Sequence, residues 1–151
     1  IARRQRQMCI RDRGKYDALC GAYYDCVVCD GDMDAFLSHL KTFYDKFPYT
    51  LVNNNERHYQ AVMYTIFAML GADITPEQPT SDGRIDMVLK TDDCLYIFEL
   101  KYGKDAETAI AQIENKKYAA AFADDKREKV LVGINFSEDS RTIDDWSVIG
   151  M

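Results

Sequence analysis

Apolar residues recur along this chain first at helical spacing and later at strand spacing. Up to Leu70 they return every three or four positions, which predicts two helices, Met33–Phe47 and Glu56–Leu70. Asp32 and the run Asn53–Asn55 precede these helices, and Asp and Asn are favoured N-cap residues. Residues 14–30 have no clear period, and both a terminal helix and a strand remain open for them.

After Gly71 the period changes to the alternation of β-strands. We expect three antiparallel strands joined by short turns, at Ala72–Gln78, Arg84–Lys90 and Cys94–Lys101. Asp105 then caps a long helix that we expect from Ala106 to about Ala123. The apolar run Lys129–Phe136 suits a central strand, reached through the helix by a parallel, right-handed crossover. Thr142–Ile149 is either a last edge strand or a short tail.

The predicted order α-β-β-β-α-β, with a possible last strand, is typical of an α/β protein with a mixed central sheet flanked by helices. At 151 residues and 47% hydrophobic content, the chain fits one compact domain. No apolar run in the sequence approaches the roughly 20 residues that a membrane span needs, and the first residues lack the apolar core of a secretion signal. We therefore expect a cytoplasmic protein with no membrane partner.

The first thirteen residues differ from the rest of the chain, because they follow neither helical nor strand periodicity. Gln7–Arg13 can be back-translated as CAG ATG TGT ATA AGA GAC AGR, which resembles a transposase end sequence used to prepare sequencing libraries. We interpret residues 1–13 as an assembly artefact joined to a truncated reading frame; the alternative is a basic, disordered arm. The expected domain is then residues 14–151, and its formal charge falls from −6 to −10, because five arginines and one aspartate are lost.

The acidic balance argues against a protein that coats nucleic acid, since neutralising phosphates normally takes a basic surface. A local basic groove on an acidic protein remains compatible with DNA binding. The lysines and arginine between residues 104 and 129 are either such a patch or ordinary exposed cations among acidic neighbours.

The chain has five cysteines, an odd number without a disulfide framework, which favours reduced thiols: Cys9, Cys20, Cys26, Cys29 and Cys94. Cys26 and Cys29 have the inner spacing of a zinc knuckle, but no second pair follows. Ordinary buried cysteines are therefore the favoured interpretation.

Three charged residues interrupt two of the apolar strands. Glu99 and Lys101 share one face of their strand because side chains alternate, and Asp86 on the paired strand can lie beside them. Buried charges are costly unless they pair or bind a metal. Two carboxylates suit Mg²⁺, and a neighbouring lysine can orient water and stabilise the negative charge that develops on a phosphorane. The pattern indicates metal-assisted phosphodiester hydrolysis; the alternative is a structural salt bridge at a sheet edge.

Asp86, a hairpin and then Glu99-Leu100-Lys101 resemble the signature of the PD-(D/E)XK nuclease superfamily. The longer run from Glu56 through Trp146 is similar to the C-terminal nuclease domain of a bacterial AAA-ATPase-like family. This resemblance is carried by Thr80–Asp86, Phe98–Lys101, Ala109–Ile113, Lys116–Tyr118 and Val132–Ser137. It implies a restriction-endonuclease-like core over about residues 54–149.

The resemblance also implies a role for each site residue. Asp86 and Glu99 would hold Mg²⁺, or Mn²⁺ as a substitute, with help from the backbone carbonyl of Leu100. Lys101 would position the attacking water. Glu56 would reach the metal through water or bind a second ion; its alternative is a simple first-turn charge on its helix.

Two further residues enter through the resemblance. Gln112 would orient the site from the following helix, or it is only a solvated glutamine. Glu77 stands where the family is often acidic, and the resemblance gives it no definite role.

Two functions follow, from different classes. The first is a Mg²⁺-dependent nuclease that cuts DNA; the second is a catalytically inactive nuclease-like module that serves as an interaction or regulatory domain for an AAA-type ATPase. The family implies an ATPase-like domain ahead of the nuclease, and this chain has no G-x-x-x-x-G-K-[ST] phosphate loop. We therefore expect that domain on a part of the protein missing from this chain.

Overall fold

The computed structural model describes residues 18–46, 48, 50 and 53–151. The segment 1–13, for which the sequence predicts an artefact or a basic arm, lies outside the described residues. The elements in chain order are α2 (Ala18–Ala22), the π-helix η1 (Tyr23–Cys29), α3 (Met33–Asp45), α4 (Glu56–Met69), β1 (Asp73–Thr80), β2 (Gly83–Lys90), β3 (Cys94–Tyr102), α5 (Ala106–Asn115), the 3₁₀-helix η3 (Tyr118–Phe122), β4 (Glu128–Phe136) and β5 (Ile143–Gly150). No helix within these ranges is long and apolar enough to cross a membrane.

The strands form one sheet in the order β1-β2-β3-β4-β5. β1, β2 and β3 are an antiparallel meander, whereas β3 and β4 are parallel, so the predicted parallel connection through α5 is confirmed. The last segment is a strand rather than a tail, because β5 pairs antiparallel with β4. The predicted mixed sheet flanked by helices is therefore confirmed.

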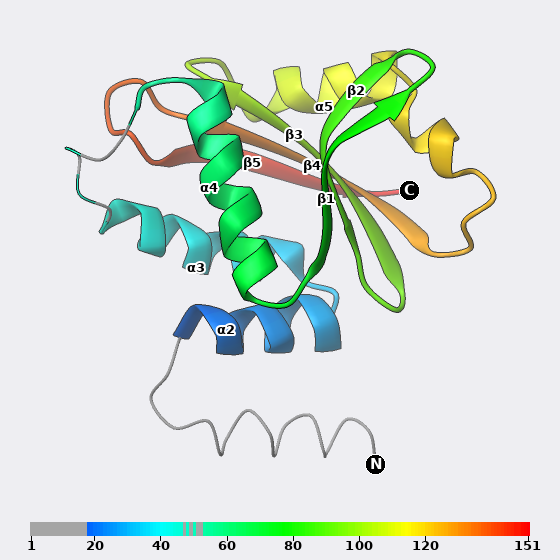
Figure 1. Cartoon of the computed structure of the whole chain (residues 1–151), viewed down its shortest axis with the longest axis horizontal. Helices are drawn as coiled ribbons and strands as arrows, with labels where there is room; N and C mark the ends of the chain where they lie inside the picture. The colour runs from blue at the N-terminus through cyan, green and yellow to red at the C-terminus, as the bar shows by residue number, and fades with distance from the viewer. Residues whose placement is uncertain (1–17, 47, 49, 51–52) are drawn as a thin grey trace.

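Two hydrophobic cores lie on opposite faces of the sheet. The larger core packs the N-terminal helices against one face, where Phe36, Phe67 and Phe98 are fully buried. The smaller core packs α5 and η3 against the other face through residues such as Ile97 and Leu131. Figure 1 shows α2, α3 and α4 together on one side of the sheet and α5 on the other. Each face therefore has its own helical layer.

The three predicted N-caps all make the expected bond. Asp32 Oδ1 accepts from the Ala35 amide at 2.9 Å, and Asn55 Oδ1 accepts from the His58 amide at 2.7 Å. Asp105 Oδ1 accepts from the amide of the third residue of α5 at 2.6 Å. Caps of this kind contribute about 1 kcal/mol each, and they fix where α3, α4 and α5 begin.

The helix expected to reach Ala123 is shorter than predicted. α5 ends at Asn115, and Lys117 adopts a left-handed backbone (φ 51°) before the chain continues as η3. This change of direction places the Tyr118 side chain against the sheet, where its hydroxyl donates to the Arg84 carbonyl at 3.0 Å and the residue is 2% exposed. A tertiary contact thus overrides the helical propensity of the segment.

The first turns of α5 lie very close to β4. A Cβ added at Gly133 would come within 2.7 Å of the Ala106 carbonyl oxygen, so only glycine permits this approach. Asp145 Oδ2 accepts from the Ala106 amide at 2.9 Å, and Asn135 Oδ1 accepts from the Lys104 amide at 2.9 Å. These bonds anchor the start of α5 over the end of the sheet.

Candidate active site

The pairing of β2 with β3 brings Asp86 and Glu99 together. The register runs from Lys90 opposite Leu95 to Met87 opposite Phe98, and Asp86 and Glu99 are the next residues of the two strands. Beyond the last pair, a side chain joins the strands: Asp86 Oδ2 accepts from the Leu100 amide at 2.8 Å. The Asp86 carboxylate is therefore held against β3 at the point where the paired register ends.

Lys101 and Glu99 form a buried ion pair on the same face of β3. Lys101 Nζ donates to Glu99 Oε1 at 2.9 Å, and the two residues are only 6% and 2% exposed. The second oxygen, Glu99 Oε2, is buried and has no hydrogen-bond partner in the described part of the chain. A buried acceptor without a partner is costly, so this oxygen is suited to bind something else.

The charge of Asp86 disfavours ionisation of Glu99. Burial is the largest cause that raises the pKa of Glu99 to about 7, and the negative charge of Asp86 is the second, although Lys101 opposes the shift. Burial also raises the pKa of Asp86, which the hydrogen bond from Leu100 and the charges of Lys101 and Arg84 counteract. A cation placed between the two carboxylates would relieve this repulsion.

Helix α4 supplies two residues at this end of the sheet. Gln60 Nε2 donates to the Asp86 backbone carbonyl at 2.9 Å, so it holds Asp86 from the side of α4. Glu56 is exposed in the first turn of α4, and its charge contributes to the raised pKa values of Asp86 and Glu99, after burial. Sequence reasoning missed Gln60, although its place four residues after Glu56 puts both on one helix face.

Gln112 and Leu100 are placed less directly. Gln112 is half-buried on α5, beside Ile113, which faces the sheet; among the described residues, no hydrogen bond joins the Gln112 side chain to either carboxylate. The Leu100 amide donates to Asp86, and the Leu100 side chain belongs to the larger core. The roles of the Leu100 carbonyl as a metal ligand and of Gln112 as an orienting group stay predictions.

The donor set fits a hard divalent cation. Mg²⁺ is usually held by one or two carboxylates and keeps several waters, and Asp86 with the unpartnered Glu99 Oε2 supplies such a pair. Across residues 18–46, 48, 50 and 53–151, no group of three or more His, Cys, Asp and Glu side chains gathers as a metal cluster. Water and backbone oxygens would therefore complete the coordination of a metal here.

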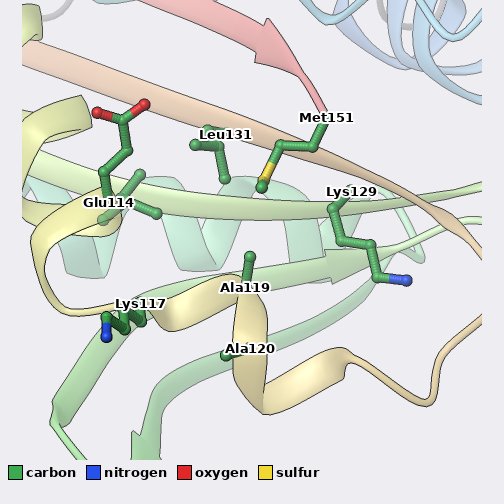
Figure 2. Close-up of a pocket in the computed structure, with 8 residues that line it drawn as sticks. Glu114, Lys117, Ala119, Ala120, Lys129, Leu131 and Met151 are labelled. Atoms are coloured by element: carbon green, nitrogen blue, oxygen red, sulfur yellow. The ribbon is translucent and has the colours of Figure 1, made fainter.

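An open hollow of about 470 Å³ lies elsewhere on the α5 face. Its lining is Ile113, Glu114, Lys117, Ala119, Ala120, Lys129, Leu131 and Met151. Figure 2 shows Met151 pointing toward Ala119, whereas the charged ends of Glu114 and Lys129 point outward. The hollow lies toward the start of β4, whereas Glu99 is paired with Gly133 further along that strand. Its apolar walls offer little to a phosphodiester, so we place the candidate site at Asp86, Glu99 and Lys101.

Comparison with known proteins identifies the family. The family model of the PD-(D/E)XK nuclease superfamily matches residues 54–146. The chain belongs to the PD-(D/E)XK nuclease superfamily. Its five-stranded mixed sheet between helical layers is consistent with the restriction-endonuclease-like fold of that superfamily. The matched range includes all the residues of the candidate site.

A relative from Azotobacter chroococcum mcd 1, described as an uncharacterized protein in the vnfD 5′ region, is 32% identical over 130 residues. The alignment covers 82% of this chain and 25% of the relative, so the chain spans about a quarter of that protein's length. No solved structure matches the chain.

Within this PD-(D/E)XK domain, three of the predicted side chains form one connected cluster. Lys101 is bonded to Glu99, and the Glu99 carboxylate is coupled to that of Asp86. Glu56 acts on the cluster through its charge, and Gln112 lies on the helix that covers the same face. The geometry therefore separates a central trio from two peripheral residues.

Proposed function

We propose that this domain is a Mg²⁺-dependent nuclease that hydrolyses phosphodiester bonds of DNA. The observation that carries the proposal is the buried, unpartnered Glu99 Oε2 beside a second carboxylate and a buried lysine. A purely structural ion pair between Glu99 and Lys101 would be weakened by the nearby charge of Asp86. A site that takes up a divalent cation uses that excess negative charge.

In this mechanism, Asp86 and Glu99 would hold Mg²⁺, or Mn²⁺ as a substitute, and the Leu100 carbonyl would be a further ligand. The cation would supply Lewis-acid polarisation of the phosphate. Lys101 has three donor hydrogens, of which one is engaged with Glu99 Oε1 at 2.9 Å. The remaining two orient the attacking water and stabilise the negative charge that builds up on the phosphate. Hydrolysis leaves a 5′-phosphate, by analogy with the superfamily.

Two peripheral residues complete the proposed site. Glu56, exposed at the start of α4, binds a water or a second ion near the carboxylates. Gln112 orients the site from α5. Asp86 itself is positioned by the Gln60 side chain and by the Leu100 amide, which bond to its backbone and its carboxylate.

We propose an AAA-ATPase-like domain as the partner that delivers DNA. The relative from Azotobacter chroococcum is about four times as long as the matching region, which leaves room for further domains in that protein. The formal charge of −6 also favours a separate DNA-binding partner, because an acidic nuclease domain gains from a partner that supplies affinity for DNA.

The test measures cleavage and metal binding separately. The chain is incubated with supercoiled, linear, single-stranded and branched DNA in Mg²⁺ or Mn²⁺, alongside Asp86→Ala, Lys101→Ala and the control Asp124→Ala. Asp124 is an exposed carboxylate near the opposite end of the sheet. We expect both site variants to lose cleavage and the control to retain it.

Calorimetry with Mg²⁺ and Mn²⁺ then separates the roles. Asp86→Ala should lose metal affinity, whereas Lys101→Ala should keep it, because the lysine acts on water and phosphate. Full cleavage by Lys101→Ala would refute the mechanism. Neither cleavage nor metal binding in the unsubstituted chain would instead favour the inactive, regulatory module.

A further inference from the structure

We propose that Arg84 binds a backbone phosphate of the DNA beside Asp86, and that Glu77 holds the Arg84 guanidinium in place until the phosphate displaces it. This inference rests on the proposed function, since it names the residue through which the same site recognises its substrate. Neither residue belongs to the trio described above.

The backbone of Arg84 is fixed from two directions. Its carbonyl accepts from the Tyr118 hydroxyl at 3.0 Å, and it pairs with Pro79 of β1. At the preceding residue, Gly83, a Cβ would come within 3.1 Å of the same hydroxyl, and φ is 150°, which L side chains rarely adopt. The side chain of Arg84 is nevertheless 58% exposed. A cation on a fixed backbone with an accessible head is well placed to bind a ligand.

The guanidinium also lies within electrostatic range of Asp86, one of the candidate metal ligands. Arg84 and Asp86 are two residues apart on β2, so the backbone of Arg84 lies close to that of Asp86. Burial raises the pKa of Asp86, and Lys101 and Arg84 are the two positive charges that oppose this rise. Lys101 is buried and bonded to Glu99, so Arg84 is the cation of this pair that an incoming phosphate can reach.

The position of Glu77 explains how Arg84 is held. Glu77 falls between the pairs Pro76–Met87 and Gln78–Ile85, and it is the residue of β1 that the paired register with β2 leaves out. Its backbone is left-handed (φ 52°), and its carboxylate lies 3.4 Å from the Arg84 guanidinium. The strand thus departs from regular geometry at the residue that meets Arg84.

The Glu77–Arg84 pair is suited to exchange. Both side chains are substantially exposed, at 42% and 58%, and exposed ion pairs contribute little to stability. Arginine binds phosphate through two parallel hydrogen bonds, which are shorter and stronger than those of a loose surface pair. A DNA phosphate can therefore replace the Glu77 carboxylate without disturbing the fold.

The experiment measures DNA binding without catalysis. Fluorescence anisotropy of a labelled duplex and a labelled single strand is recorded in EDTA at several salt concentrations. The proteins are the unsubstituted chain, Arg84→Ala, Arg84→Lys, Arg84→Gln and Lys46→Ala. Lys46 is an exposed lysine at the end of α3, beside Ala18 and Leu19 of α2, so it controls for loss of one positive charge. Circular dichroism checks that each variant is folded.

We expect Arg84→Ala and Arg84→Gln to bind about tenfold more weakly. On duplex DNA, the slope of log K against log salt should fall by about 0.9, the value for one lost phosphate contact. Arg84→Lys should keep the slope, because it keeps the charge, and Lys46→Ala should match the unsubstituted chain. Arg84→Gln keeps a polar side chain without the charge, so it tests the phosphate contact if Arg84→Ala does not fold.

Unchanged affinity and slope in Arg84→Ala or Arg84→Gln would overturn the inference, as would a chain that binds neither oligonucleotide. Failure of the phosphate contact can be distinguished from failure of the proposed nuclease activity. A chain that binds DNA through Arg84 and cleaves nothing in Mg²⁺ refutes the nuclease alone. A chain that cleaves DNA with no dependence on Arg84 refutes the phosphate contact alone.

Discussion

Replacing Glu99 by glutamine tests the electrostatics of the site directly. Glutamine keeps the shape of the side chain and an oxygen for Lys101, but it removes the charge that burial and Asp86 disfavour. The pKa of Glu99 is raised from its ordinary value of 4.5 to about 7. At about 1.4 kcal/mol for each pKa unit, an ionised Glu99 lowers the free energy of unfolding by about 3 kcal/mol.

The sign follows from proton binding. A carboxyl group whose pKa is higher in the folded chain binds more protons there than in the unfolded chain, so stability falls as pH rises. The loss begins near pH 4.5, the ordinary pKa, and is complete above about pH 7. Between pH 4.5 and 8 we therefore expect the metal-free chain to lose about 3 kcal/mol relative to Glu99→Gln.

Urea denaturation in EDTA across this pH range measures the difference. Glu114→Gln is the matched control, because it makes the same substitution at an exposed glutamate of α5. A constant difference between Glu99→Gln and the unsubstituted chain over the whole range would refute the reasoning. Both proteins carry Asp86, whose raised pKa acts in the same direction and largely cancels in the comparison.

Two further substitutions test the contacts that position the site. Gly133→Ala should destabilise the fold by about 1–3 kcal/mol in urea denaturation, because its Cβ would come within 2.7 Å of a carbonyl oxygen of α5. Gly150→Ala is the control. Its Cβ would come no nearer than 3.3 Å to a flexible side chain, so it should destabilise the fold less. Tyr118→Phe should cost about 1 kcal/mol, because the hydrogen bond to the Arg84 carbonyl is lost. Tyr64→Phe, at an exposed tyrosine, should leave stability unchanged; equal losses in both tyrosine variants would contradict the contact.

Periodicity and capping residues were enough to predict α3, α4, the start of α5 and the strands, whereas the segment that forms α2 and η1 was left open between a helix and a strand. Asp32 and Asp105 each accept the bond expected of an N-cap, and the change of period after Gly71 marks the start of the sheet. The end of α5 was wrong, because the run from Lys116 onward is helical by composition and only the contact of Tyr118 with β2 redirects it. Local sequence does not contain that contact.

The candidate site was likewise predicted from the sequence only in part. Glu99 and Lys101 were visible because charge interrupts an apolar strand, and strand alternation placed them on one face. Gln60 was missed because a glutamine on a helix is ordinarily solvated, and its bond to the Asp86 carbonyl depends on how α4 packs. The roles assigned to the predicted site residues stay predictions until the variants are measured.

The central trio lies on a single hairpin, since Asp86 and Lys101 are separated only by the rest of β2, a short turn and β3. Its geometry thus depends on contacts close in sequence, which form early and quickly in folding. The helix α5, which covers the face of β3 that carries Glu99 and Lys101, and the neighbouring strand β4 come later in the chain. During synthesis from the N-terminus, the hairpin therefore emerges with its charges still hydrated. The free-energy cost of removing water from the Glu99 carboxylate arises only when the last third of the domain packs against the hairpin.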